Sequence, residues 1–526
     1  MTMKAVRPAK GATKGQKSAS DLFMYAAIFA TVLSIAYWTA YASNAYNTFH
    51  EYADVGMSAF NMYYYIHYSG NVTGLQWLVF ADHVSPIQLL IALPVFYIDQ
   101  SVMTLLVMQA VLLSLSGLLL FFIVRDLLKS GALGLLFCLG LLLSPAMHGM
   151  LIFDYHAESF ILPFYLLTFY FFMKARVKPF VLSSLLLICT IEEAPFLSLT
   201  LGIGLLLYVV LGSRDGSRSV TDAKLMMRMA LGLIAISVIA LFAYYATINY
   251  LIGTYATYPQ LPMQLQVYPF LQDQIKGVAG ASIANGPLVQ QEFLYAYVPY
   301  GLALALLGFG LTVAMDPIIL LLLASPWLTI GLLLRKYVFF YVFDQYFSYV
   351  LGGTIVAAVL GWMMLMEKRG IIVKALLKVT AGRGAGFLPS LLVASFIVVN
   401  LLLILLSPIF TLSGSTNNLS QDFLFLVTPQ QQVYYSQLRS MIALIPSNAS
   451  VVAQNFMMAH LSNREYIEQL EPGYGYFVPQ YVLVDFNENV SEGAFMNDQY
   501  GVFKALVASN YTLYASNGTA MLYRQT

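Results

Sequence analysis

Long apolar runs alternate with short polar segments along most of the chain, and this pattern predicts membrane-spanning helices. A helix needs about 20 apolar residues to cross a hydrocarbon core about 30 Å thick, and runs such as 22–42 and 101–124 meet that requirement. Shorter apolar runs between basic clusters complete the pattern, so we expect about eleven spans. The expected spans cover residues 22–42, 101–124, 131–150, 159–174, 179–193, 195–212, 228–250, 297–315, 317–334, 349–366 and 386–408.

The loop after the first span, residues 43–100, departs from this pattern. It contains two apolar pieces, 55–66 and 86–98, each too short to cross a membrane. We therefore expect two helices that lie in the membrane interface, amphipathic or half-buried.

The C-terminal segment, residues 409–526, has a third pattern. The runs SVVAQNF (450–456) and QYVLVDF (480–486) are typical of buried strands, and helical pieces lie between them. The predicted fold class is therefore an all-α polytopic membrane bundle, with interfacial helices in the first outer loop and a small α/β C-terminal domain outside the membrane.

Composition supports a membrane protein and excludes several other classes. Hydrophobic residues make up 59% of the chain and charged residues only 10%, too few to cover the surface of a soluble protein of this length. In a membrane protein the formal net charge of +1 says nothing about nucleic acid, and no basic patch with interleaved aromatic residues suggests such a partner. Cys138 and Cys189 both lie in apolar runs, so we expect core residues and no disulfide framework.

The distribution of Lys and Arg predicts the orientation, because cytoplasmic loops collect basic residues. The tail 1–20 carries five basic residues and should be cytoplasmic, so an odd number of spans puts the C-terminus outside. We divide the chain into the tail 1–20, a transmembrane domain 21–408 and an extracytoplasmic domain 409–526. The first span is too long for a cleaved signal peptide, and no small-residue cleavage site follows it.

Acceptor sequences for N-glycosylation agree with this orientation. The pattern Asn-x-Ser/Thr belongs on the non-cytoplasmic face, and each occurrence lies in a segment that the basic residues place outside. These candidate glycosylation sites are Asn71, Asn418, Asn448, Asn489, Asn510 and Asn517. We therefore expect an integral protein of the cell membrane with its glycosylated parts outside.

Ionisable residues gather in the predicted outer turns. The stretch IFDYHAESF (152–160) places Asp154, His156 and Glu158 in the short turn between two spans, where an ionised group costs less than at the bilayer centre. They could cap helices and contact headgroups, or they could act with the carboxylates and histidines of the other outer turns around a shared cavity. Those other residues are Glu51, Asp54, Asp82, His83, Glu192, Glu193 and Asp344.

A metal and a phosphate are two ligands that these turns could bind. Asp154, His156 and Glu158 could ligate a divalent metal (Mg²⁺ or Mn²⁺), provided that the turn is extended. Arg335 and Lys336 form the conspicuous basic pair on the outer side, and could contact a phosphate or anchor the chain to headgroups. Two other outer acids, Asp99 and Asp316, precede spans and are better explained as helix N-caps.

Short motifs from about residue 50 onward form a recognisable combination. They are Asp54-Val55-Gly56, His83-Val84-Ser85-Pro86, Phe153-Asp154-Tyr155-His156-Ala157-Glu158, Ser325-Pro326-Trp327, Gln345-Tyr346, Ser450-Val451, His460-Leu461-Ser462 and Tyr481-Val482-Leu483-Val484-Asp485. In this combination the chain resembles the membrane family known as domain of unknown function twenty seventy-nine. That family is similar to the GT-C glycosyltransferases, polytopic enzymes that use lipid-linked sugars.

The resemblance implies a chemistry for the outer turns. A sugar would pass, with inversion, from a polyprenyl-phosphate donor to an acceptor at the outer membrane face. Asp54 of the first outer loop would be the base, because the attacking hydroxyl must lose a proton. The leaving phosphate would need positive charge or a metal. The candidate substrate-binding residues are Glu51, Asp82, His83, Asp154, His156, Glu158, Glu193, Arg335, Lys336 and Gln345.

The chain departs from the family's pattern at two places. Ser58 stands where the family has Phe, a few residues after the first-loop Asp. Ile191-Glu192-Glu193 stands where Lys-Glu-Asp is usual, so a basic residue that might pair with phosphate is missing. This difference bears on the donor site more than on the fold.

A non-catalytic membrane protein is the alternative. A transporter should have ionisable residues near the membrane midplane, interrupted helices and often paired repeats, whereas here the charges lie at the outer edge and we find no repeat. A structural subunit of a membrane complex fits the sequence better than a transporter, because a fold can persist without its chemistry. Its partners would be membrane lipid and other membrane subunits.

Overall fold

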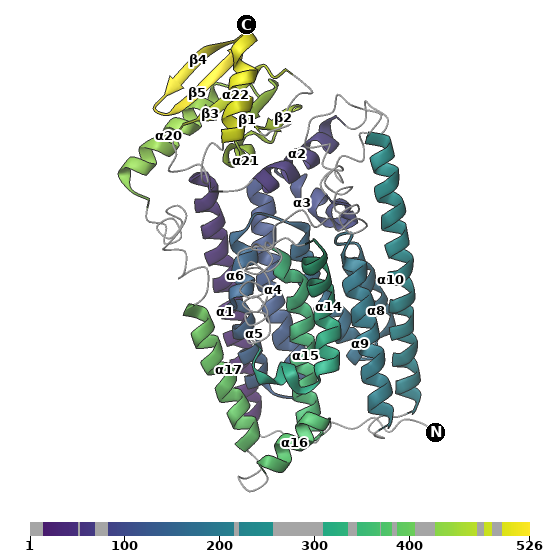
Figure 1. Cartoon of the computed structure of the whole chain (residues 1–526). Coiled ribbons are helices and arrows are strands. Elements are labelled where there is room, and N and C mark those ends of the chain that lie inside the picture. The colour runs from purple at the N-terminus through teal and green to yellow at the C-terminus, as the bar shows by residue number, and fades with distance from the viewer. Residues whose placement is uncertain are drawn as a thin grey trace.

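The computed structural model shows a long helical bundle with a small sheet domain at one end (Figure 1). It describes residues 14–50, 53–68, 83–214, 220–255, 309–334, 345–368, 370–380, 387–405, 427–470, 478–486 and 497–526. The N-terminal part of the chain lies at the opposite end of the bundle from the sheet. We call the end that carries the sheet domain the sheet end.

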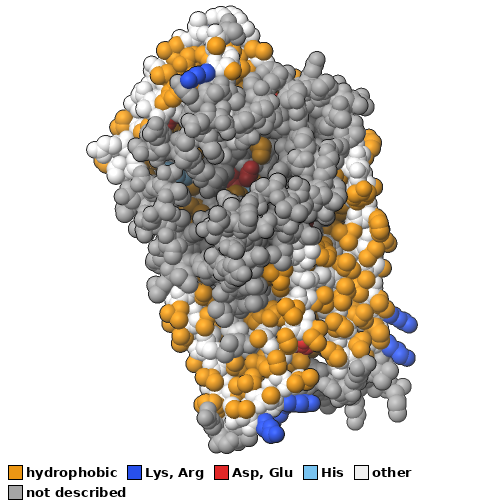
Figure 2. All heavy atoms as spheres, in the orientation of Figure 1, with side chains coloured by type: hydrophobic (Ala, Val, Ile, Leu, Met, Phe, Trp, Pro, Cys, Tyr) orange, Lys and Arg blue, Asp and Glu red, His pale blue; other side chains and the backbone are white. Residues whose placement is uncertain are grey.

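The bundle is built from apolar helices. They are α1 (Lys14–Asn47), α4 (Val102–Leu128), α5 (Gly131–Leu142), α6 (Pro145–Ile152), α7 (Ile161–Met173), α8 (Val177–Ile188), α9 (Ala194–Arg214), α10 (Val220–Tyr255), α14 (Pro317–Leu334), α15 (Ser348–Met366) and α17 (Phe387–Leu405). Short turns η4 (Ala157–Phe160), η7 (Leu311–Met315) and η9 (Gln345–Phe347) precede α7, α14 and α15, and helix α16 (Ile371–Val379) follows α15. Figure 2 shows apolar side chains along the flank of the bundle and Lys and Arg side chains near the end opposite the sheet.

The prediction of a polytopic bundle is confirmed at a coarser level than eleven spans. Among the described residues, five helices are long and apolar enough to cross a membrane, and α5 with α6 makes a sixth if this pair, bent by 44°, is one span. The helices α7, α8, α14 and α17 fall where spans were expected but are shorter. Most of the expected span 297–315 lies outside the described residues.

Local sequence signals explain several helix boundaries. The Asp316 side chain accepts a hydrogen bond from the Ile319 backbone N–H at 3.2 Å, so it caps α14 as predicted. Asp99 accepts from the Ser101 N–H at 3.1 Å, and Ser101 itself is the N-cap of α4. The prediction that Asp99 is the N-cap is therefore wrong, because Ser101 occupies that position and Asp99 supports it from two residues earlier. Cys138 is buried, and neither it nor Cys189 forms a disulfide.

The first loop forms helices at both apolar pieces. Helix α2 (Ala53–His67) covers the first piece, and the π-helical turn η3 (Gln88–Ala92) followed by α3 (Leu93–Phe96) covers the second. Both lie at the sheet end, between the bundle and the sheet domain (Figure 1). The predicted helices are present, and their place in a membrane interface stays a prediction.

The C-terminal residues form the predicted α/β domain. Strands β1 (Val451–Ala453), β2 (Ile467–Gln469), β3 (Tyr481–Asp485), β4 (Tyr511–Asn517) and β5 (Ala520–Gln525) accompany helices α20 (Pro429–Ala443), α21 (Met458–Leu461) and α22 (Asn497–Asn510), with turn η10 (Asn455–Met457) before α21. The strand order is β2-β1-β3-β5-β4; β1 pairs in parallel with β2 and β3, and β5 is antiparallel to β3 and β4. Every residue of β1 and β3 is buried, which explains why these two strands are continuous apolar runs.

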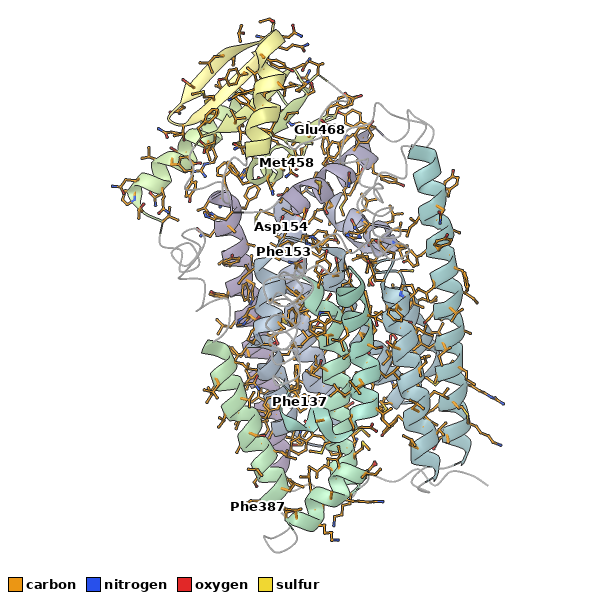
Figure 3. The ribbon with its side chains drawn as sticks, viewed as in Figure 1. Phe137, Phe153, Asp154, Phe387, Met458 and Glu468 are labelled. Atoms are coloured by element: carbon orange, nitrogen blue, oxygen red, sulfur yellow. The ribbon has the colours of Figure 1, made fainter. Side chains whose placement is uncertain are left out.

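The sheet domain rests on α2 through α21. A Cβ added to Gly56 would lie 2.7 Å from the backbone nitrogen of Ala459, so only glycine allows this approach. His460 stacks on Tyr46 and Phe49 with ring centroids 4.1 Å apart, and its Nε2–H donates to the Tyr46 carbonyl at 2.9 Å. These contacts hold the sheet domain against the first loop, directly above the turn that carries Asp154 (Figure 3).

Candidate functional site

The turn between α6 and η4 is attached to the start of α2. Asp154, 1% exposed, accepts a hydrogen bond at 3.0 Å from the backbone N–H of Val55. That N–H belongs to the first turn of α2, where helix N–H groups lack partners within the helix and a negative charge is favourable. The bond joins residues that are 99 positions apart, and it positions Asp54, which precedes Val55.

Gln109 of α4 holds the same turn from below. Its buried side-chain amide donates toward the carbonyl oxygens of Met150, Phe153 and Asp154 at 2.9–3.1 Å. Its Oε1 accepts from the backbone N–H of His156 at 3.0 Å. One polar side chain inside an apolar helix thus satisfies the backbone groups of a turn that has no regular structure.

His156 and Asp54 form an ion pair at the centre of the site. The Nδ1–H of His156 donates to the Asp154 carbonyl at 3.0 Å, which turns Nε2 toward the Asp54 carboxylate at 3.4 Å. The imidazole is 7% exposed, whereas the Asp54 side chain is 35% exposed. The carboxylate therefore reaches solvent while its histidine partner is enclosed.

Charge and burial act in opposite directions on this pair. Burial alone would lower the pKa of His156, but the hydrogen bond and charge of Asp54, together with the charge of Glu158, raise it to about 10. Burial alone would raise the pKa of Asp54, but His156 and the more distant His83 bring it below its ordinary value. Both groups are charged at neutral pH.

Glu158 is buried nearby and forms no hydrogen bond through its carboxylate among the described residues. Its side chain is 1% exposed, and neither carboxylate oxygen has a hydrogen-bond partner among the described residues. A buried carboxylate without hydrogen bonds is costly and normally gains a proton or a cation. The sheet end thus contains a buried carboxyl group beside the Asp54–His156 pair.

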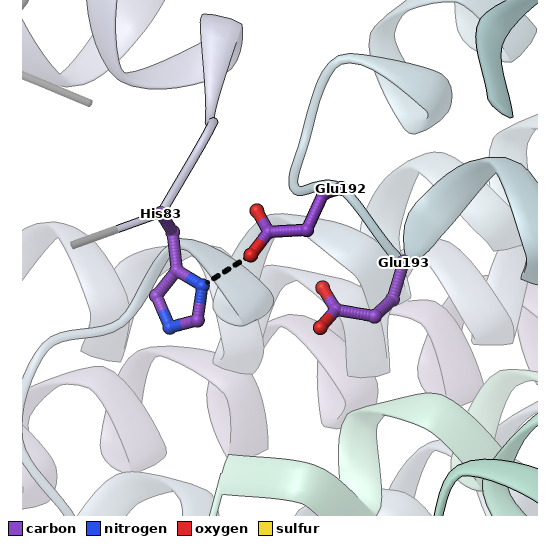
Figure 4. A group of neighbouring side chains, drawn as sticks. All are labelled: His83, Glu192 and Glu193. Carbon is purple, nitrogen blue, oxygen red and sulfur yellow. Dashed lines mark hydrogen bonds and ion pairs between the residues drawn. The ribbon is translucent and has the colours of Figure 1, made fainter. Parts of the chain in front are cut away.

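A second cluster lies beside the first, where residues 83–87 meet the turn between α8 and α9. Ser85 Oγ–H donates to the Thr190 carbonyl at 2.5 Å and the Ile87 N–H donates to the Cys189 carbonyl at 2.7 Å. These bonds bring the Nδ1 of His83 to 2.7 Å from Glu192 Oε1, with Glu193 alongside (Figure 4). One donor atom from each of His83, Glu192 and Glu193 lies within 4.8 Å of the others.

The second cluster places two carboxyl groups beside one imidazole. Burial and the neighbouring charge of Glu192 raise the pKa of Glu193 well above its ordinary value, although His83 acts in the opposite direction. One oxygen each of Glu192 and Glu193 is buried without a hydrogen-bond partner among the described residues. The negative charge of Glu158 also raises the pKa of Glu193, so the two clusters are electrostatically linked.

Comparison with known protein families is decisive at this point. A family model described as a predicted membrane protein, DUF2079, matches residues 27–519. The chain belongs to the DUF2079 family. The resemblance seen in the motifs of the first loop and of the turn at 153–158 is therefore confirmed at the level of the family. A search of curated proteins found no match.

The structure of this DUF2079 protein brings some of the predicted site residues together. Asp54, Asp154 and His156 are in direct contact or share partners, and His83 and Glu193 belong to the adjoining cluster. Gln345 begins η9. Glu51, Asp82, Arg335, Lys336 and Asp344 lie outside the described residues.

Metal binding by Asp154, His156 and Glu158 stays a prediction, and several of their donor atoms already have protein partners. Both ring nitrogens of His156 already have partners, and one oxygen of Asp154 accepts from Val55. Glu158 lies in the 3₁₀ turn η4, so the extended alternation that would put three side chains on one face ends at His156. The group with metal-ligand proximity in the described part of the chain is His83, Glu192 and Glu193.

The glycosylation candidates fall on the sheet domain or outside the described residues. Asn448 and Asn510 are exposed, and Asn517 is half-buried at the end of β4. The residues outside the described ranges are Asn71, Asn418 and Asn489. Glycosylation itself stays a prediction.

Two contacts of the candidate site in this DUF2079 protein are not evident from the sequence. The role of Gln109 has only a weak signal, a single amide inside an apolar span. Glu192 is one of several outer acids in the sequence. Its pairing with His83, 109 residues away, depends on the hydrogen bonds between residues 85–87 and 189–190.

Proposed function

We propose that this DUF2079 protein is a glycosyltransferase of the GT-C type, which moves a sugar from a polyprenyl-phosphate donor to an acceptor hydroxyl. The single observation that carries the proposal is the Asp54–His156 pair: a partly exposed carboxylate held at 3.4 Å by an enclosed imidazolium. Asp54 occupies the first loop, where the resemblance puts the base. Asp154 holds the backbone of Val55, next to Asp54, and Gln109 holds the backbone of His156. A proton acceptor has to be held in a fixed position of this kind.

In the proposed reaction Asp54 accepts the proton of the attacking hydroxyl. The bond between the acceptor oxygen and the anomeric carbon forms as the bond from that carbon to the phosphate oxygen breaks, and polyprenyl phosphate leaves. The lowered pKa of Asp54 keeps this carboxylate ionised in the resting protein. The acceptor hydroxyl becomes acidic enough to protonate Asp54 only as the new bond to the anomeric carbon forms. His156 orients the carboxylate and neutralises part of its charge.

The proposal includes an orientation and a number of spans. The sheet end faces outward, the tail 1–20 is cytoplasmic, and about eleven helices span the membrane. The clustering of Lys and Arg near the opposite end (Figure 2) supports this orientation through the preference of cytoplasmic segments for basic residues. The exposed Asn448 and Asn510 of the sheet domain lie on the side where glycans are added.

The test is donor turnover by the purified chain in lipid nanodiscs. A panel of synthetic polyprenyl-phosphate hexoses and pentoses is supplied with a membrane extract as the source of acceptor, and release of polyprenyl phosphate is followed by mass spectrometry. Asp54→Asn keeps the shape of the side chain but removes its basicity, so we expect turnover to fall by at least about 100-fold. Asp316→Asn, at the cap of α14, should stay within about twofold of the wild type, because Asn also caps helices.

Two results would contradict this function. Equal loss from Asp54→Asn and Asp316→Asn would mean that the effect is on folding and not on chemistry. The absence of turnover with every donor would favour the non-catalytic alternative, a subunit of a membrane complex.

A further inference from the structure

The cluster of His83, Glu192 and Glu193 has the composition and proximity of a cation site. It combines one imidazole and two carboxylates, and their donor atoms lie within 4.8 Å of one another. Ligand atoms around a divalent cation are roughly 3–4 Å apart, because each lies about 2.0–2.2 Å from the ion. Small rotations of the two glutamate side chains would therefore bring the three donor atoms to the separations found around a bound cation.

The backbone holds this cluster independently of any bond between its side chains. Residues 83–87 are attached to the turn at 189–190 by the Ser85 and Ile87 hydrogen bonds. Glu192 and Glu193 follow that turn directly and point toward His83 (Figure 4). The ligands are therefore presented by two short segments of fixed backbone, as a preorganised metal site requires.

Four buried carboxylate oxygens in this region lack a hydrogen-bond partner among the described residues. The Glu192 side chain is 7% exposed, and its Oε2 has no hydrogen-bond partner among the described residues. One oxygen of Glu193 and both of Glu158 are in the same condition within those residues. Three carboxyl groups thus share a region with two histidines, His83 beside Glu192 and Glu193, and His156 beside Glu158. Buried carboxylates of this kind are normally paired or bound to a metal.

We propose that His83, Glu192 and Glu193 bind a divalent cation, with His83 Nδ1 and one oxygen from each glutamate as protein ligands. On binding, the cation replaces the proton that His83 and Glu192 share, and that proton is released to solvent. Glu158 adds negative charge to the region without being a ligand. The inference stands apart from the proposed function, because it requires only that the folded chain bind the ion.

The donor set selects the kind of ion. Carboxylate oxygens favour Mg²⁺, Ca²⁺ and Mn²⁺, whereas imidazole favours Zn²⁺ and other transition metals. A site with one nitrogen and two oxygens fits Mn²⁺ or Zn²⁺ better than Mg²⁺ or Ca²⁺. Mn²⁺ is the more useful probe, because its binding is visible by electron paramagnetic resonance.

The experiment titrates Mn²⁺ into the full chain, purified without a histidine tag and treated with chelator. Loss of the free Mn²⁺ signal should show one ion bound per chain. Glu193→Gln and His83→Gln should each weaken binding at least about tenfold, and Asp316→Asn should leave it unchanged. Competition by Zn²⁺ should displace the bound Mn²⁺.

A second measurement uses the wild-type protein, so that the test does not depend on whether the variants fold. Pulsed resonance of bound Mn²⁺ should detect coupling to an imidazole nitrogen. That nitrogen would belong to His83, because His83 is the histidine of the group with metal-ligand proximity in the described part of the chain. No binding at about 1 mM free Mn²⁺ (about −4 kcal/mol), binding that ignores both variants, or a spectrum without nitrogen coupling would each overturn the proposal.

Discussion

Replacing Gly56 by alanine should separate the sheet domain from α2. The added Cβ would lie 2.7 Å from both the Ala459 nitrogen and the Met458 carbonyl carbon, whereas unstrained contacts of this kind are about 3.5–4.0 Å. Backbone atoms cannot rotate away as a side chain can, so α21 must move by about 1 Å. The nearby stacking and hydrogen bond of His460 resist that movement.

Two opposing effects set the magnitude for Gly56→Ala. Alanine stabilises a helix by about 1 kcal/mol relative to glycine, whereas overpacking costs about 1–3 kcal/mol. Because the clash is with backbone, we take the upper part of that range and expect a net loss of about 1–2 kcal/mol in the free energy of unfolding. Gly232 of α10 provides a matched control, because a Cβ added there meets no atom within 4 Å. Gly232→Ala should be neutral or stabilising.

The assay combines thermal unfolding in detergent with hydrogen exchange at the amides of α21. Gly56→Ala should lower the unfolding midpoint and speed exchange at residues 458–461, and Gly232→Ala should do neither. If both variants unfold like the wild type and α21 stays protected, the close approach of α2 and α21 does not support the sheet domain.

Three further changes test Gln109, His156 and His460. Gln109→Leu leaves several backbone groups of the turn unpaired, so the free energy of unfolding should fall by about 2–4 kcal/mol. An unchanged melting midpoint would mean that the hydrogen bonds of Gln109 do not stabilise the turn. The pKa of His156 is raised to about 10, so stabilisation by its pair with Asp54 is complete below about pH 6.5 and is lost as the pH rises toward 10. The difference in midpoint between wild type and His156→Gln should therefore shrink from pH 6 to pH 10. Burial lowers the pKa of His460 to about 4, so stabilisation by neutral His460 is present above about pH 6.5 and is lost as the pH falls toward 4. Proteolysis of the sheet domain should accelerate over that interval in the wild type and less in His460→Gln.

The sequence predicts those helices and strands in which consecutive residues have the same degree of burial. The strands β1 and β3 are buried throughout, so their apolar runs identify them. Strand β2 contains Glu468 and Gln469 among only three residues, and most of β4 is exposed, so neither has an apolar pattern to detect. The break between α5 and α6 follows the Ser144-Pro145 pair, whose effect on direction depends on packing.

The candidate site is likewise predictable from the sequence only in part. That Asp54, Asp154 and His156 lie at one end of the bundle follows from their places beside spans, and the structure pairs two of them directly. Which donors could share a metal does not follow, because it depends on backbone conformation within each turn. Glu158 falls in a helical turn, whereas Glu192 and Glu193 are brought to His83 by hydrogen bonds between segments far apart in sequence.

The docking of the first loop on α21 has a consequence for the order in which the protein forms. The hydrogen bond from His460 to Tyr46 spans 414 positions, and that from Arg439 to Asn47 spans 392. During synthesis the ribosome adds His460 and Arg439 only after the residues of helices α4 to α17. The face of α2 that carries Gly56 is therefore not covered by α21 during most of translation. Contacts of such high sequence separation form slowly. The first loop is therefore the segment that a chaperone or a neighbouring membrane protein would meet bare in the nascent chain.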